Sequence, residues 1–115
     1  MADSALFVGW NRSVHGKEKE ALEVLSSALA FYGKQAAAGV IESFEPVLLS
    51  HHGGDLNGFV LIRGDGPKLD AFAQSDEFRD LLLKADMCVN GIGVIHGYVG
   101  EGMMRELARF QKTIT

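Results

Sequence analysis

His96 stands in the setting that most favours chemistry in this sequence. It lies in the segment VNGIGVIHGYVGEG (residues 89–102), among β-branched, aromatic and glycine residues. A histidine in an apolar strand must be hydrogen-bonded or functional. Three roles stay open for it: a core or interface histidine whose hydrogen bonds are satisfied, a ligand-contacting acid or base, and a metal or haem ligand. If the protein is an enzyme, we expect His96 to be the general base.

Polar and aromatic side chains also stand where predicted strands end. Trp10 and Asn11 close the first predicted strand, with a plain core role as the alternative for Trp10. Arg63, near another strand end, could neutralise an anionic ligand group or form a surface ion pair. His51 and His52 are adjacent, so on a strand only one of them points into a pocket. Otherwise both are solvated loop histidines.

Glycines alternate with larger residues in the last predicted strand, and Gly91, Gly93 and Gly97 fall on one face. Glycine weakens a strand, so close packing or empty space is the usual reason for it. The favoured interpretation is a helix packed against this bare backbone, with the opposite face lining a pocket. The alternatives are a cavity on the other face of the sheet and a bulge that breaks the alternation. The predicted ligand-binding residues are Trp10, Asn11, His52, Phe59, Arg63, Asn90 and Tyr98.

Motifs with a strong chemical signature are missing. No two histidines have a metal-site spacing on one helix, so no metal site is expected. The segment GDGPKLD (64–70) lacks the spacing and the Lys-Ser/Thr of a phosphate loop, and no nucleophile elbow or dinucleotide fingerprint is present. Cys88 has no evident base beside it, so we interpret it as a small buried apolar residue.

The composition is that of an ordinary globular chain. Its 115 residues predict one domain, residues 1–115, and its 11 basic and 15 acidic residues give a net charge of −4. Without a cluster of Lys or Arg, neither nucleic acid nor an anionic membrane is an expected partner. The single cysteine fits a reducing compartment, and we recognise neither a signal peptide nor a transmembrane segment. We therefore expect a cytoplasmic protein.

Hydrophobic periodicity predicts the order of elements. Alternating or continuous apolar runs predict strands, and apolar residues three and four apart predict helices. Ser75, followed by acidic residues, is a good helix N-cap and divides one helical region into two parts or kinks it. The predicted strands are 5–11, 40–50, 59–64 and 88–99, with helices at 17–38 and 65–85 and a short helix at the C-terminal tail.

This order, two split βαβ units, predicts an α+β ferredoxin-like sandwich. One antiparallel four-stranded sheet would carry the long helices on one face. The other face would leave apolar residues such as Phe59 and Leu61 in water. A second copy of the chain is the simplest cover, so we expect a homodimer that pairs its sheet faces.

The element order, the chain length and a helix SDEFRDLLLKAD (75–86) that leads into an apolar fourth strand resemble the dimeric α/β-barrel superfamily. In that superfamily two ferredoxin-like sheets pair into a barrel. The resemblance covers Ala5 to about Phe110. It implies a small-molecule-binding protein, with cofactor-independent monooxygenases, isomerases and haem-degrading enzymes among its members.

Two hypotheses follow for function. The first is a protein that binds a small apolar or aromatic ligand and that, as an enzyme, oxidises or isomerises an aromatic or polyketide-like compound without a cofactor. His96 would then be the base, while Asn11 and Arg63 orient the substrate. The second is a non-catalytic dimeric structural or interaction domain. Haem binding is a third, weaker option.

Overall fold

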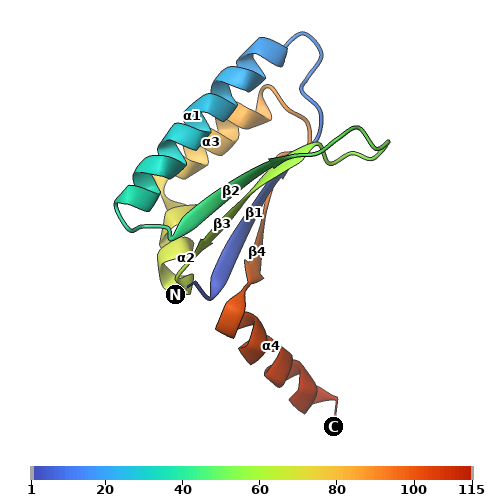
Figure 1. Cartoon of the computed structure of the whole chain (residues 1–115). Coiled ribbons are helices and arrows are strands. Elements are labelled where there is room, and N and C mark those ends of the chain that lie inside the picture. Colours follow the sequence, from blue (N-terminus) through green and yellow to red (C-terminus); the bar gives the residue numbers. More distant parts are fainter. Residues whose placement is uncertain (1, 115) are drawn as a thin grey trace.

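The computed structural model describes residues 2–114 and contains four strands and four helices (Figure 1). The strands are β1 (Ser4–Trp10), β2 (Ser43–Leu48), β3 (Gly58–Gly64) and β4 (Gly93–Tyr98), and the helices are α1 (Glu18–Ala37), α2 (Gly66–Gln74), α3 (Asp76–Asp86) and α4 (Gly100–Thr113). The predicted order is confirmed. The helical region is two helices that meet at Ser75.

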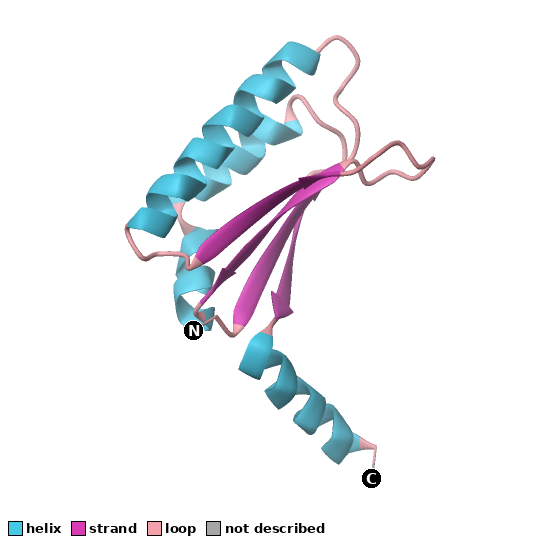
Figure 2. Cartoon of the chain, in the orientation of Figure 1, coloured by secondary structure: helices cyan, strands magenta, loops and turns pink. Residues whose placement is uncertain are grey.

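One antiparallel sheet in the order β2-β3-β1-β4 forms the centre of the fold. Helices α1, α2 and α3 cover one face, and no helix among residues 2–114 covers the other, because α4 extends from the end of the sheet (Figure 2). The sheet is open, with β2 and β4 at its edges. This confirms the predicted ferredoxin-like α+β arrangement.

Ser75 ends one helix and begins the next. Its extended backbone (φ −66°, ψ 146°) breaks the helical path. Its hydroxyl donates to the Phe72 carbonyl at 2.7 Å and accepts from the Phe78 N–H at 3.3 Å. One side chain thus satisfies a backbone group of each helix, which is the usual task of a cap.

The core lies between the sheet and these helices. From the sheet, Leu6, Val8, Val60 and Ile62 point into it, because they alternate with residues of the open face. The helices contribute an aromatic cluster of Tyr32, Phe72 and Phe78, and the rings of Phe72 and Phe78 lie 4.7 Å apart. Burial of each large side chain contributes about 1.5–3 kcal/mol.

The register corrects the interpretation of the glycines. His96 lies opposite Leu6 and therefore shares the helix side of the sheet, whereas Gly93 and Gly97 lie opposite Gly9 and Ala5 and share the open face. A Cβ added to Gly93 or Gly97 would meet nothing within 4 Å. The expectation that a helix packs against this bare backbone is wrong.

The last strand is also shorter than the predicted 88–99. Gly91 has φ +66°, a left-handed conformation that favours glycine and breaks the alternation before β4 begins. Val89 forms only an isolated bridge with Ser13. Gly91 therefore belongs to a turn and not to the glycine face of β4.

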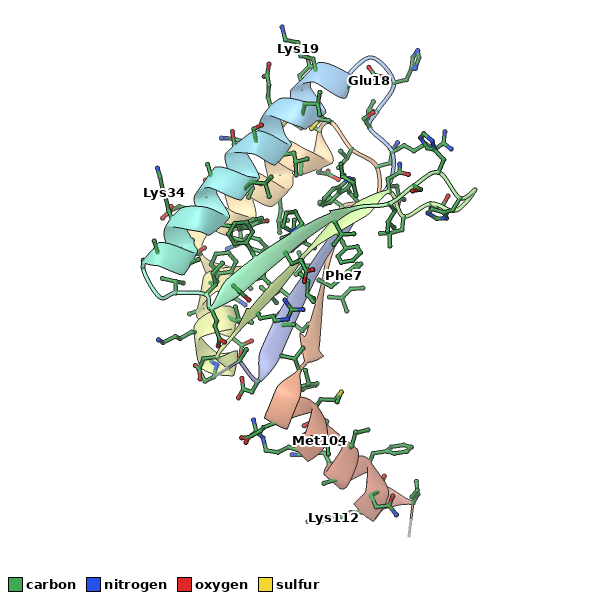
Figure 3. The ribbon with its side chains drawn as sticks, in the orientation of Figure 1. Phe7, Glu18, Lys19, Lys34, Met104 and Lys112 are labelled. Atoms are coloured by element: carbon green, nitrogen blue, oxygen red, sulfur yellow. The ribbon has the colours of Figure 1, made fainter. Side chains whose placement is uncertain are left out.

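Among the described residues, the open face is largely apolar and carries the ion pair of Arg63 with Glu45. Phe7 and Phe59 stack with ring centres 4.7 Å apart, and Ile95 is 64% exposed beside them on β4. Figure 3 shows Phe7 on the side of the sheet away from α1. No helix within residues 2–114 is long and apolar enough to cross a membrane.

Candidate functional site

An apolar cavity of about 80 Å³ lies between the sheet and helices α1 and α3. Its floor comes from β1 and β3 and its walls from the two helices, with one end closed by the chain between α3 and β4. The lining residues are Val8, Trp10, Ala21, Val24, Leu25, Ala28, Tyr32, Val60, Leu81, Leu82, Ala85, Cys88, Val89 and Ile92. The hydrophobic side chains that build the fold therefore also build this cavity.

Three lining residues carry a polar group: the Trp10 indole, the Tyr32 phenol and the Cys88 thiol. Burial raises the pKa of Tyr32 well above its ordinary value, so the phenol stays neutral. Burial, and secondarily the charge of Glu20, raises the pKa of Cys88. The thiol lies 3.5 Å from the Lys84 carbonyl oxygen, as a weak donor. The cavity is lined by uncharged side chains and suits an uncharged, largely apolar ligand.

Asn11 and Asn90 meet beside Trp10, at the end of β1. The Asn11 N–H donates to the Asn90 carbonyl at 2.8 Å, and the Asn11 side chain occupies the space that a Cβ on Gly91 would need. Neither asparagine lines the cavity. The structure thus brings Trp10, Asn11 and Asn90 together at one end of the sheet.

His96 and Tyr98 lie elsewhere, at the β4 edge. They line a hollow of about 240 Å³ that also includes Ser4 and Asp70. The His96 Nδ1 lies 3.8 Å from the Asp70 Oδ1, and its side chain is 60% exposed. His96 is therefore not buried in an apolar strand, because β4 is an edge strand and α2 lies beside this position without covering it.

The remaining predicted residues occupy other places. Phe59 lies on the open face in its stack with Phe7, and Arg63 pairs there with Glu45 at 3.3 Å, the surface ion pair that was the alternative. His52 Nε2 lies 2.7 Å from the Leu56 carbonyl oxygen, and its Nδ1 accepts from the Gly54 N–H at 3.2 Å. These contacts hold the His52 ring against the backbone of its own loop.

Sequence reasoning assigned the helix residues of the cavity to the core alone. Val24, Leu25 and Tyr32 carry the apolar stripe of α1, and Leu81 and Leu82 carry that of α3. A stripe of this kind predicts burial, whereas a void inside it depends on how far apart two helices pack. Among the described residues, no group of three His, Cys, Asp or Glu side chains is placed to hold a metal ion.

These features define a ferredoxin-like α+β protein with one open sheet face. The chain is similar to a dimeric protein of unknown function with a ferredoxin-like fold from Bacteroides fragilis (TM-score 0.61, 13% identity, covering 84% of this chain and 96% of that one). It is also similar to SnoaB, a cofactor-independent oxygenase from Streptomyces nogalater (0.52, 20%, 86% and 93%). A third structure is a putative antibiotic biosynthesis monooxygenase from Caulobacter crescentus (0.58, 12%, 85% and 89%).

No protein-family model and no curated protein matches the sequence. At these identities the similar structures establish the fold. They confirm the ferredoxin-like architecture predicted for the chain, the one also found in the dimeric α/β-barrel superfamily.

Proposed function

We propose that the protein binds a small, uncharged aromatic or otherwise apolar molecule in the cavity between the sheet and helices α1 and α3. The observation that carries this proposal is a lining that is apolar except for the neutral groups of Trp10, Tyr32 and Cys88. Pockets with an apolar lining and a few polar groups are the usual small-molecule sites. The phenol and the indole N–H can orient a ligand carbonyl or hydroxyl by hydrogen bonding.

The size of the cavity sets a condition on binding. Its 80 Å³ is smaller than the roughly 150 Å³ cavity that accommodates benzene in an engineered protein. A fused-ring compound therefore requires α1 and α3 to move apart. We expect binding to shift the side chains of both helices, with the sheet as the fixed wall.

We further propose that the ligand is oxidised without a cofactor. Similarity to a structure described as a cofactor-independent oxygenase supports this choice. In such a reaction a ring CH₂ becomes a carbonyl: the substrate supplies the electrons, and dioxygen supplies one atom to the product and one to water. Asn11, just past the end of β1, lies five residues along the chain from Leu6, the partner of His96, so it would orient a part of the substrate remote from this CH₂.

His96 remains the proposed general base, with the edge hollow as its place of action. A base must lie within hydrogen-bond reach of the proton that it removes, and the exposed His96 imidazole can be approached from this hollow. A substrate confined to the apolar cavity would not meet His96. Loss of turnover in His96→Ala with binding unchanged would support this role, and unchanged turnover would exclude it.

The second candidate is a non-catalytic dimeric domain. The apolar open face, with Phe7, Phe59 and the exposed Ile95, favours a protein partner whatever the cavity does. In both candidates we propose that a second copy covers this face and completes a barrel. The description of two similar structures as dimeric supports self-association.

The test is native mass spectrometry of the gently purified protein, with and without added anthrone as the aromatic probe. Bound mass that disappears in Ala28→Leu supports the cavity, because Ala28 lines it and the added methylene groups fill it. Ala30→Leu is the matched control, because Ala30 is exposed on the same helix. A bare dimer that binds no probe would favour the non-catalytic domain.

A further inference from the structure

Helix α4 presents an apolar stripe that its own chain leaves bare. Met103, Leu107, Phe110 and Ile114 recur at intervals of four, three and four residues, and so fall within an arc of about 60°. All four are exposed, Phe110 by 63%. A helix with so narrow an apolar stripe is typical of one that packs against another surface along its whole length.

The direction of this helix is built into the fold. Asp3 binds the start of α4, residues 99–105, which we call the root of the helix. The Asp3 carbonyl accepts from the Val99 N–H at 3.2 Å, and the Asp3 carboxylate accepts from Arg105 at 3.0 Å. The other carboxylate oxygen accepts from the Gly66 N–H at 2.9 Å. Gly102 is buried so close to the Asp3 carbonyl that a Cβ would overlap it.

Beyond this root, α4 points away from the main body of its own chain (Figure 1). Its contacts with other elements are confined to β1 and β4. Figure 3 marks Met104 and Lys112 toward its two ends and shows no sheet or helix beside it. The contacts of the root therefore keep the apolar stripe of α4 away from the sheet and helices of its own chain.

The charges of the helix disfavour a lipid surface. Arg105 is paired with Asp3, and Arg109 lies 3.9 Å from Glu106. The whole chain carries a net charge of −4, which repels an anionic membrane. The stripe itself is uncharged, and so is the aromatic pair of the open sheet face, Phe7 and Phe59.

The helix and the open sheet face together offer the area of a protein interface. A large apolar side chain exposes up to about 200 Å². The four side chains of the stripe, each about half exposed, therefore offer on the order of 400 Å² on α4 alone, against roughly 800 Å² per partner in a stable complex. A two-fold axis would use the helix of each copy and add the open sheet face beside it.

We propose that α4 is an arm that packs its stripe on a second copy of this chain, beside the paired open sheet faces. This rests on the proposed sheet-face dimer and adds to it an exchanged helix from each protomer. The apolar stripe then extends the interface that the two open sheet faces form. The inference does not depend on which ligand the cavity binds.

The test is sedimentation equilibrium of the full chain with Leu107→Ser/Phe110→Ser. We expect the dimer dissociation constant to rise at least tenfold. The control is Ala108→Ser/Gln111→Ser, which places two serines in the same helix outside the stripe and is expected to stay within twofold. Near-UV circular dichroism checks that the environment of Trp10 in the main body is unchanged.

A benzophenone amino acid at position 110 gives a direct readout: ultraviolet light should produce a species of twice the chain mass. Equal dimerisation of both serine pairs would overturn the arm and leave the sheet-face dimer standing. A monomeric wild type would overturn both. Stripe-dependent binding of the monomer to phosphatidylcholine–phosphatidylglycerol vesicles would assign the stripe to a membrane instead.

Discussion

The two faces of the sheet are built from the same strands but are completed in different ways. On the covered face, Leu6, Val60 and Ile62 are sealed by helices from the same chain. On the open face, Phe7 and Phe59 are only half covered and Ile95 is exposed. Chain folding alone thus covers one face, whereas the other is covered only if a second copy binds it, as proposed above. The stability of the first is independent of protein concentration, and that of the second is expected to depend on it.

Phe72→Ala, on the covered face, should cause the largest loss of stability. Phe72 is buried in the aromatic cluster, and its truncation leaves a cavity, so we expect a loss of about 3–5 kcal/mol of unfolding free energy. Urea unfolding at two protein concentrations measures it. The loss should be the same at both, and a strong concentration dependence would contradict the division between the faces.

Ile95→Lys should instead weaken association through the open face. A charge on this face opposes burial against a partner, so we expect the dimer dissociation constant to rise at least tenfold while the monomer stays folded. Light scattering over a dilution series provides the measurement. Leu22→Lys is the control, because Leu22 is 68% exposed on α1, in the opposite layer. An equal effect of the two variants would show that the open face is not the interface.

Ser75→Ala tests the covered face with a smaller expected loss of stability. The substitution removes the hydroxyl that bonds to Phe72 and Phe78, and loss of a helix cap costs about 1 kcal/mol. Thermal unfolding should show a lower midpoint. Ser75→Asp tests the cause, because its carboxylate can still accept from the Phe78 N–H, and it should recover part of the loss.

The smallest predicted effect is that of acid, which should weaken the contacts between Asp3 and the root of α4. The Gly66 N–H, which donates to the Asp3 carboxylate, lowers the pKa of that group, and Arg105 adds to this. A lowered folded-state pKa means that the contribution is present above the unfolded pKa of about 3.9 and is lost as the pH falls through the folded value. Amide exchange at α4 should therefore rise in acid. Asp3→Asn should abolish this pH dependence, and its persistence would place the acid response elsewhere.

The helices and their order could be predicted because periodicity depends on local spacing alone. Leu25, Leu29 and Tyr32 mark α1 without knowledge of its neighbours. The orientation of β4 could not be predicted in this way. Which parity of its residues faces the helices depends on the pairing of His96 with Leu6, a contact 90 positions away in sequence.

The candidate site was predictable only in part for a related reason. Trp10 lines the cavity, and Asn11 and Asn90 lie beside it because the strand ends meet there. The exposure of His96 depends on the edge position of β4, which an apolar flanking sequence does not reveal. The cavity depends on helix separation, and no single segment encodes that.

The tie between Asp3 and the residues from Val99 to Arg105 also sets an order in time. Asp3 and Val99 are 96 positions apart, so the arm gains its direction only after both segments have been made and brought together. Assembly through that helix would therefore follow the closing of this long-range contact. Its rate would depend on the concentration of protomers in which the contact has already formed.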